Sequence, residues 1–445
     1  MAQLNARVDR LPVWGLSPVV FMVLGLCYFF AFYDITAIGS TLPVIVKDLN
    51  IPESASSVPI TSNLLGYVIG AYLFGTLADY IGRRASLAAA VGVLVVGALL
   101  TAFSWNLASL TAFRFLTGIG IGAQIALSAT LVGEFSSATR RGRYLAFNVF
   151  WGGVGLIIPD FIAVPLGAVP NGWRVVFGLG ALIVVVLPFL TDRFVPESPR
   201  WLILHGKTER AEIVVDRMEN RASRITGQAI PPAPAVPPEI HLRAFPTVDL
   251  VRHYLGRLVL VLAFWFFFYM MIYAYLAFEP TLLVKMGLSL PSGQLVSGVS
   301  LLGYIVGGVS AVLWIERFDR RYTVAGGLAV MVIGFIVIAT GRGVLPVIVG
   351  GWLVSVANYA MLSPAYAYTA EVFPTRARAS GMSIGDGIGH LGGAVQPFII
   401  IALLAVGARY GFWFMAASAA VALSLMLVAG VRSTRGAPLT SLAHQ

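Results

Sequence analysis

Charge is scarce in this sequence. Only 11 % of its 445 residues are charged and 58 % are apolar, with a mean hydropathy of +0.85, whereas a soluble domain carries about 25 % charged residues. So few charges cannot cover a surface that faces water, and most of this surface is therefore expected to face an apolar medium. The composition excludes an ordinary soluble enzyme.

Cysteine is scarcer still. Cys27 is the single cysteine and lies inside an apolar run, so a disulfide framework and a cysteine metal site are both excluded, and we interpret it as a small buried side chain. The sequence also lacks a convincing catalytic triad, a phosphate-binding loop and a cluster of metal ligands. We therefore expect no enzymatic activity, no cofactor and no metal, and ATP-driven transport is disfavoured.

Long apolar runs, in contrast, are abundant. A membrane-spanning helix needs about 20 mostly apolar residues, and runs of this length rule out the short strands of a membrane barrel. The first run leads directly into others, and we interpret it as a spanning helix rather than a cleaved signal. The twelve candidate spans are 18–41, 58–78, 86–104, 109–133, 144–169, 173–191, 257–279, 292–315, 323–341, 345–370, 380–404 and 409–430.

The spans fall into two groups of six. The sequence therefore predicts an all-α integral membrane protein with an N-terminal six-helix bundle over 1–191 and a C-terminal six-helix bundle over 257–445. Between them lies a charged cytoplasmic linker over 192–256. Within the linker, residues 207–224 have the pattern of an amphipathic helix, and the proline tract from Pro231 to Glu239 is expected to be extended.

Basic residues determine the predicted orientation. The net charge is +10, but the arginines and lysines lie in short loops between apolar runs, which is typical of membrane topology rather than of nucleic-acid binding. If both termini are cytoplasmic, 24 of the 30 basic residues lie on the cytoplasmic side, five lie at the outer ends, and Arg114 lies within the membrane. We therefore expect a multi-pass protein of the cell (inner) membrane with cytoplasmic termini.

The two halves are related by an internal repeat. With a shift of 237 residues, GTLADYIGRR (Gly75 to Arg84) lies over VLWIERFDRR (Val312 to Arg321), and Glu134 lies over Glu371. This is the pattern of a parallel repeat, in which both halves have the same direction across the membrane. The repeat predicts two pseudo-symmetric bundles.

Four motifs, in order, resemble the major facilitator superfamily over nearly the whole chain. GTLADYIGRR resembles the family's loop between helices 2 and 3, and RFLTGIGIG (Arg114 to Gly122) resembles its helix 4 motif. PESPRWL (Pro196 to Leu202) follows helix 6 as in sugar porters and organic-ion transporters, and AYTAEVFPTRARASG (Ala367 to Gly381) resembles the helix 10–11 junction of the organic-ion, niacin and aromatic-acid branch. The resemblance implies a monomeric secondary transporter whose halves rock around a central site.

The resemblance also implies a cytoplasmic gate made of loop charges. These charges would stabilise the outward-open state and separate when the inward path opens; the alternative is plain positive-inside charge with loop turns. In the second copy Asp319 stands at the position of Gly82, so a tight glycine turn is lost and this loop is expected to be looser. The predicted gate residues are Asp79, Arg83, Arg84, Glu134 and Arg140 in the first half and Glu316, Arg320, Arg321, Glu371 and Arg378 in the second.

Charges inside the predicted spans are few, and each costs about 2.5–3.5 kcal/mol at mid-bilayer. Asp34 lies in helix 1 and Arg114 near the outer end of helix 4, and because these helices run in opposite directions the two residues fall at a similar depth. An arginine favours the ionised form of a carboxyl, and loss of that contact favours its protonation. Asp34 is therefore a candidate proton carrier modulated by Arg114, as in the proton symporters that the chain resembles; a structural ion pair is the alternative.

Other polar side chains within the spans are candidates for the substrate site. Asp160 faces either the cavity or a packing site, and Glu279 is expected at the outer mouth, in water. Asp386 and His390 are spaced i, i+4 and share a helix face, and histidine titrates near neutral pH; a structural pair is the alternative. Side chains that could hold a planar substrate, or else pack between helices, are Tyr33, Gln124, Asn148, Trp151, Tyr273, Asn358, Tyr359 and Tyr366.

We expect proton-coupled transport of a small organic or aromatic carboxylate, with the lipid bilayer, protons and that substrate as partners and no nucleic acid. Helix 5 (Trp151 to Gly167) lacks the Gly-Pro-x-x-Gly-Gly element of drug antiporters, which favours symport. Helix 7 (Trp265 to Pro280) lacks the Gln-Gln-x-Ser-Gly pattern of sugar porters, so a sugar:proton symporter is the runner-up. An organic-cation transporter and an uncoupled facilitator stay open, whereas a channel would not need two charge locks.

Overall fold

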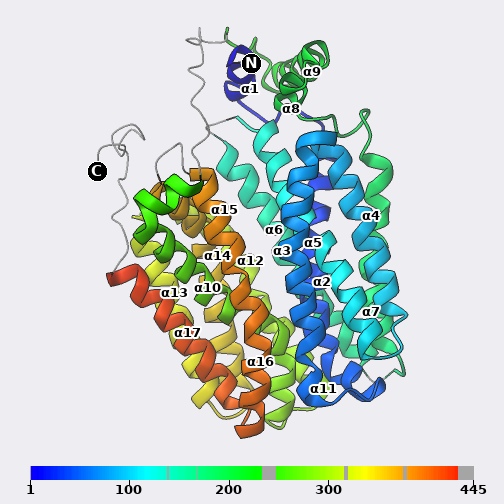
Figure 1. Ribbon diagram of the computed structural model, residues 1–445, viewed down its shortest axis with the longest axis vertical. Coiled ribbons are helices and arrows are strands. Elements are labelled where there is room, and N and C mark those ends of the chain that lie inside the picture. The colour runs from blue at the N-terminus through cyan, green and yellow to red at the C-terminus, as the bar shows by residue number, and fades with distance from the viewer. Residues whose placement is uncertain are drawn as a thin grey trace.

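The computed structural model describes residues 2–137, 140–167, 169–232, 247–314, 319–373 and 378–428, and these ranges are built from helices (Figure 1). Within them, twelve spans are long and apolar enough to cross a membrane. The spans form two bundles of six, so the predicted all-α integral membrane fold is confirmed. The residue boundaries predicted for the bundles and the linker stay a prediction.

The helices of the first bundle begin with clear local signals. Ser17 accepts a hydrogen bond from the backbone N–H of Val19 at 3.3 Å, and Pro18 occupies the first turn, where a missing N–H costs nothing. Asn106 and Ser109 form a reciprocal capping box before the fourth span. The spans are α2 (Pro18–Asp48), α3 (Ser57–Ile81), α4 (Arg83–Ala102), α5 (Leu107–Phe135), α6 (Arg141–Leu166) and α7 (Gly172–Gly180), the last continued by the 3₁₀ helix η2 (Ala181–Phe189).

Three predicted spans are not single α-helices. The sixth continues as the 3₁₀ helix η2, which contains Pro188; proline has no N–H for an α-helical hydrogen bond. The eighth span is divided at Leu302 and the eleventh at His390. The second bundle consists of α10 (Thr247–Lys285), α11 (Leu290–Leu301) with α12 (Gly303–Trp314), α13 (Arg320–Thr340), α14 (Val344–Val372), α15 (Arg378–Gly389) with α16 (Leu391–Val406), and α17 (Arg409–Val428).

Glycines allow α3 and α5 to pack backbone against backbone. A Cβ atom added at Gly118 would lie 2.0 Å from the carbonyl oxygen of Asn63, and one at Gly122 would lie 2.0 Å from that of Tyr67. Such contacts are far closer than any side chain permits, and small residues are what bring membrane helices this close. The glycines of RFLTGIGIG are therefore explained by helix packing.

Short helices gather at one end of the molecule, called here the α9 end; the other end is called the opposite end. Figure 1 shows α1 (Ala2–Asp9), α8 (Pro199–Leu204) and α9 (Thr208–Thr226) beyond the spans at the α9 end. Helix α9 lies in the range predicted as an amphipathic helix, 207–224, and its buried residues share one face. Most of the predicted proline tract lies outside the described residues.

A charged contact attaches the N-terminal helix to α9. Arg7 Nε donates to Glu219 Oε1 at 3.0 Å, and Arg10 Nη2 lies 2.5 Å from the same oxygen. Burial raises the pKa of the Glu219 carboxyl, but the hydrogen bonds and charges of Arg7 and Arg10 outweigh this effect, so its pKa lies below the ordinary value. The pair therefore favours docking of α1 at neutral pH.

Contacts between the bundles are concentrated toward the opposite end. Gly39 of α2 lies so near α10 that an added Cβ would be 2.3 Å from the carbonyl oxygen of Leu276. Polar contacts also cross between the bundles in this part of the molecule. They join Lys285 Nζ to Glu53 Oε1 at 2.5 Å, Gln294 Nε2 to the Ser40 carbonyl oxygen at 2.8 Å, and Thr61 Oγ1 to the Ala394 carbonyl oxygen at 2.9 Å.

Candidate functional site

Asp34 and Arg114 form a buried ion pair inside the first bundle. Arg114 Nη1 donates to Asp34 Oδ2 at 2.6 Å, and both side chains are at most 2 % exposed. Phe177 lies beside the guanidinium, with 5.2 Å between Cζ and the ring centroid. Asp34 Oδ1 and Arg114 Nε have no hydrogen-bond partner in the described part of the chain. The expected contact is therefore present, while its role in proton coupling stays a prediction.

A second cluster, called here the aromatic box, lies where α10, α14 and α15 meet α3 of the first bundle. The hydroxyls of Tyr269 and Tyr366 both donate to Asp386 Oδ1, the latter at 3.3 Å, and lie 3.0 Å from each other. The predicted i, i+4 pair on the eleventh span is thus part of a larger group. The box consists of Tyr67, Tyr269, Tyr273, Tyr366, Asp386 and His390.

His390 lies between two tyrosine rings of the aromatic box. Its ring centroid is 3.7 Å from that of Tyr269 and 4.6 Å from that of Tyr67, with interplanar angles of 31° and 21°. Its Nδ1 lies 2.8 Å from the backbone carbonyl oxygen of Asp386, so histidine contacts the backbone of Asp386 rather than its carboxylate. Because Tyr67 belongs to the first bundle and Tyr269 to the second, this stack crosses the bundle interface.

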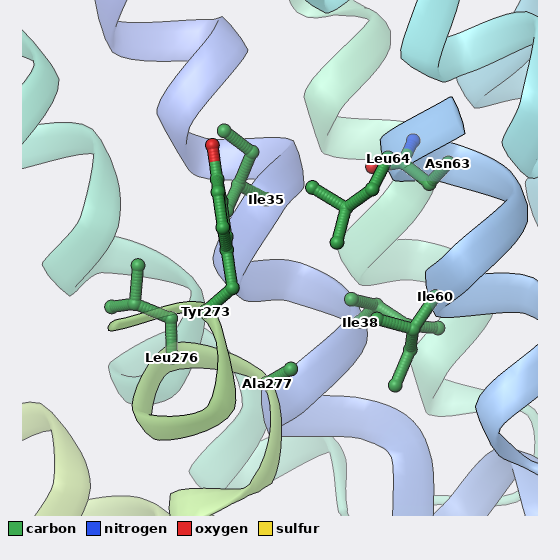
Figure 2. A pocket seen from close by; sticks show the side chains of 8 residues that line it. All are labelled: Ile35, Ile38, Ile60, Asn63, Leu64, Tyr273, Leu276 and Ala277. Atoms are coloured by element: carbon green, nitrogen blue, oxygen red, sulfur yellow. The ribbon is translucent and has the colours of Figure 1, made fainter. Parts of the chain in front are cut away.

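Beside the box, the interface encloses a cavity of about 10 Å³, which holds about one water molecule. Figure 2 shows Tyr273 of α10 beside Ile35 of α2, and Ile38 of α2 beside Ile60 of α3. The cavity is too small and too apolar for an organic solute, so the bundles are closed against each other at this depth. The lining residues are Ile35, Ile38, Ile60, Asn63, Leu64, Tyr273, Leu276 and Ala277.

The remaining substrate candidates lie in different places. Tyr359 approaches the first bundle, because a Cβ added at Gly153 would lie 2.9 Å from its ring, whereas Asn358 Nδ2 donates to Tyr304 Oη at 3.3 Å within the second bundle. The other four candidates belong to the first bundle, and their described contacts lie inside it. Tyr33 Oη donates to the Val176 carbonyl oxygen at 2.8 Å, Gln124 Nε2 to that of Ala90 at 3.5 Å, Trp151 packs on Gly25, and buried Asn148 has no described side-chain partner.

Two acidic side chains meet across the interface toward the opposite end. Ser297 Oγ of α11 lies 2.8 Å from Asp160 Oδ2 of α6 and 2.9 Å from Glu279 Oε2 of α10, and Ser40 Oγ contacts Asp160 Oδ1. The expectation that Glu279 is solvated at the outer mouth is wrong, because the residue is 1 % exposed. Helix α11 covers it, and sequence alone gave no signal for this packing.

Most of the charges predicted for the first gate are connected. Arg83 Nη2 lies 2.9 Å from Asp79 Oδ1, and Arg83 Nε lies 3.8 Å from Glu134 Oε1. Arg84 pairs with Asp192, which the sequence did not single out. Arg140 is exposed and makes no ion pair among the described residues, whereas its neighbour Arg141 lies 3.5 Å from Asp9.

The second gate is described only in part. Arg320 pairs with Glu371, while Arg321 donates to the carbonyl oxygens of Met426 and Leu427, at 2.8 and 2.5 Å, at the end of α17. Asp319 caps α13 by accepting the backbone N–H of Arg321 at 2.8 Å. Glu316 lies outside the described residues, as does the side chain of Arg378. That this loop is looser than the first stays a prediction.

Glu197 has a structural role that its sequence motif alone does not indicate. Its Oε1 accepts the backbone N–H groups of Arg83 at 2.9 Å and Arg84 at 3.3 Å, so its carboxylate caps the N-terminus of α4. Gly82 makes room for it, because an added Cβ there would lie 2.3 Å from Glu197 Oε2. The motifs GTLADYIGRR and PESPRWL, read separately from the sequence, thus form one contact.

The comparisons with known proteins agree with this architecture. The family model described as sugar (and other) transporter matches residues 19–444. The niacin transporter NiaP of Acinetobacter baylyi is 27 % identical over 445 residues, covering 99 % of each chain, and the 4-hydroxybenzoate transporter PcaK of Pseudomonas aeruginosa is 28 % identical over 431 residues, covering 90 % of this chain and 91 % of PcaK. The solved structure of the xylose transporter XylE from Escherichia coli, in a partially occluded inward open conformation, has the same fold, with a TM-score of 0.77, 20 % identity, and coverage of 94 % of this chain and 99 % of XylE. The chain therefore belongs to the sugar (and other) transporter family of the major facilitator superfamily, and it is a multi-pass membrane transporter rather than an enzyme.

Proposed function

We propose that this transporter couples the movement of a small organic carboxylate, above all an aromatic one, to that of a proton. The observation that carries the coupling is the buried contact of 2.6 Å between Arg114 and Asp34. While the guanidinium is in place it favours the ionised carboxyl, and when it moves away the buried carboxyl favours a proton. A conformational change that alters this contact therefore alters proton binding, which is the linkage that a symporter requires.

The aromatic box supports a planar aromatic substrate. The ring of His390 occupies a slot between Tyr67 and Tyr269, which is the position that a planar ring would take between two aromatic faces. A substrate that displaced this ring would contact both bundles at once. NiaP and PcaK, by their names, carry niacin and 4-hydroxybenzoate, which are both planar aromatic carboxylates.

An organic cation is the second candidate substrate. The carboxylate of Asp386 lies among the tyrosine rings of the box and accepts hydrogen bonds from Tyr269 and Tyr366. A carboxylate surrounded by aromatic faces is an arrangement that binds organic cations. The charge of the substrate therefore distinguishes the two candidates, and a sugar, which is neutral, is the third class to be tested.

We further propose that the α9 end faces the cytoplasm, with both termini inside, in the inner membrane. The support is the predicted topology, which assigns 24 of the 30 basic residues to the side of the two termini. The Arg83 and Arg320 clusters, which lie at this end, would then act as the cytoplasmic gate. A monomer is sufficient for this mechanism, because both bundles belong to one chain.

The substrate class is tested first, by binding. Thermal-shift measurements on the purified protein would compare benzoate with benzamidine, which share a planar ring but carry opposite charge, and with D-xylose. Stabilisation by benzoate and 4-hydroxybenzoate alone is expected. Stabilisation by benzamidine instead would favour the organic-cation candidate, and stabilisation by D-xylose alone would favour a sugar.

The coupling is tested by uptake of 4-hydroxybenzoate into proteoliposomes with an acidic exterior. We expect the pH gradient to drive accumulation in the wild type, and Asp34→Asn to abolish this while exchange of substrate for substrate persists. Asp48→Asn, an exposed aspartate on the same helix, is the matched control and should behave as wild type. Uptake that ignores the gradient, or that survives in Asp34→Asn, would contradict proton coupling at this residue.

A further inference from the structure

We infer that Asp160 and Glu279 form a second proton-binding site, separate from Asp34 and Arg114, which joins the two bundles near the opposite end. Asp160 belongs to α6 of the first bundle, and Glu279 belongs to α10 of the second. Ser297 of α11 lies between them. The inference goes beyond the proposed function, because it depends on the transporter fold and not on the identity of the substrate.

The number of hydrogens at this site favours a proton on one carboxyl group. Ser297 Oγ lies 2.8 Å from Asp160 Oδ2 and 2.9 Å from Glu279 Oε2. A serine hydroxyl has one hydrogen to donate, so it can make a full, linear hydrogen bond to one of these oxygens only. The other contact is a full hydrogen bond if that carboxyl carries a proton and donates it to the serine oxygen.

The second serine at the site points to the same conclusion. Ser40 Oγ contacts Asp160 Oδ1, and it also lies 3.2 Å from the carbonyl oxygen of Thr36. If Ser40 donates to that carbonyl oxygen, Asp160 must again be the donor in its contact with Ser40. If Ser40 donates to Asp160 instead, one proton on the two carboxyl groups satisfies their contacts; if it donates to Thr36, each carboxyl group carries a proton, so at least one proton is present in either arrangement.

The charges around the site also favour the protonated form. Asp160 is 0 % exposed and Glu279 is 1 % exposed, and neither forms an ion pair with a lysine, arginine or histidine in the described ranges. The titratable groups that face Glu279 from the packed helices are Asp160 of α6, Tyr275 of its own helix and Tyr304 of α12. Two unpaired negative charges held this close in a medium of low dielectric repel strongly.

The site makes closure of the opposite end depend on protonation. With one proton shared, Ser297 connects α6 to α10 and α11 by hydrogen bonds. Without it, two carboxylates on different bundles repel, and the repulsion is relieved only when the bundles separate and water enters. Release of this proton therefore favours opening of the opposite end, and its binding favours closure.

The experiment measures the distance between the bundles as a function of pH, without substrate. In a Cys27→Ala background, Ser54→Cys and Ser292→Cys place spin labels on exposed positions of the two bundles at the opposite end, and pulsed electron paramagnetic resonance reports their separation. We expect a short separation at acidic pH and a longer one at alkaline pH. Glu279→Gln, whose amide stays neutral, should keep the short separation at both pH values.

Three outcomes would overturn the inference: a separation that does not change with pH in the wild type, an unaltered pH response in Glu279→Gln, or closure by Na⁺ in place of K⁺ at alkaline pH, which would identify a metal-cation site. Asp34→Asn should lose proton-driven uptake yet keep the pH response of the labels, so this failure and that of the proposed function are distinguishable.

Infrared spectroscopy provides a second test, which uses the unlabelled wild type and therefore requires no stable variant. A buried carboxylic-acid band at neutral pH is expected, and its absence would equally overturn the inference.

Discussion

Asp34 and Asp160 are both fully buried aspartates of the first bundle, but their negative charges are compensated in different ways. Asp34 pairs with Arg114 of the same bundle at 2.6 Å, so its partner does not depend on contact with the other bundle. Asp160 meets a second carboxylate from the other bundle through a serine, with no cation beside it in the described structure. The charge of the first site is therefore compensated within one bundle, whereas the state of the second site depends on the contact between the bundles.

Removal of the arginine beside Asp34 is the strongest test of the difference between the two buried sites. Arg114→Met leaves Asp34 buried without its partner, and we expect a loss of about 3–5 kcal/mol, as for other broken buried pairs. The double variant Arg114→Met with Asp34→Asn, which removes both charges, should recover most of this loss. Thermal unfolding in detergent measures both, with Arg342→Met, an exposed arginine at the opposite end, as control.

Equal destabilisation by Arg114→Met and by Arg342→Met would show that the buried pair contributes no more than a surface charge. Failure of the double variant to recover stability would show that Arg114 acts through packing against Phe177 rather than through its charge. Either result would remove the contrast between the two sites.

Glu197 extends the comparison to a carboxylate that is compensated by backbone N–H groups. Gly82→Ala would place a methyl group 2.3 Å from Glu197 Oε2 and force a side chain into a backbone conformation with φ of 103°, at a cost of about 1–3 kcal/mol. Gly75→Ala, in the same motif but with nothing within 4 Å of the added atom, should cost little. Melting temperatures of the two variants check this, and similar losses in both would contradict the assigned cap.

Features that follow from the length, pattern and direction of individual helices could be predicted from the sequence. Twelve spans follow from apolar length, and the amphipathic pattern over 207–224 gave α9. The contact between Asp34 and Arg114 was also predictable, because opposite charges at similar depths in neighbouring spans have few other partners. Such inferences need only helix direction and depth.

Contacts between helices that are far apart in the sequence could not be predicted in this way. Glu279 lies near the end of a span, and sequence could not show that α11 covers it and brings Ser297 between it and Asp160. Tyr269 was overlooked although it precedes Tyr273 by four residues, a spacing that places both on one helix face. The contact of Glu197 with the first turn of α4 joins residues more than 110 positions apart, so the motif alone does not predict it.

The ion pair of Glu219 with Arg7 and Arg10 is partly exposed, and we expect it to contribute only weakly to the free energy of unfolding. Because the pKa of Glu219 is lower in the folded protein than in the unfolded chain, its pair with Arg7 and Arg10 stabilises the protein above the ordinary carboxyl pKa, about 4.3. This contribution is lost as the pH falls through the lowered folded value. Glu219→Gln should cost about 1 kcal/mol at pH near 7.

The difference between wild type and Glu219→Gln should vanish in acid, and melting curves over a series of pH values check this. Glu212→Gln, an exposed glutamate of the same helix, serves as the control without a stability change. A loss at neutral pH as large as that of Arg114→Met would mean that burial adds nothing to an arginine–carboxylate pair here.

The smallest effect at neutral pH is expected at the second buried site itself. Glu279→Gln replaces a carboxyl that shares a proton by a neutral amide of nearly the same shape, which can still donate a hydrogen bond to Ser297. We expect a change of less than about 1 kcal/mol, the worth of one neutral hydrogen bond, and at alkaline pH the variant should become the more stable protein. Glu53→Gln, which breaks the exposed pair with Lys285 across the same interface, controls for a general weakening of the contact. A loss of 3–5 kcal/mol in Glu279→Gln, as expected of a broken buried pair, would mean that Glu279 is ionised and well compensated, and that the two sites hold their charges in the same way.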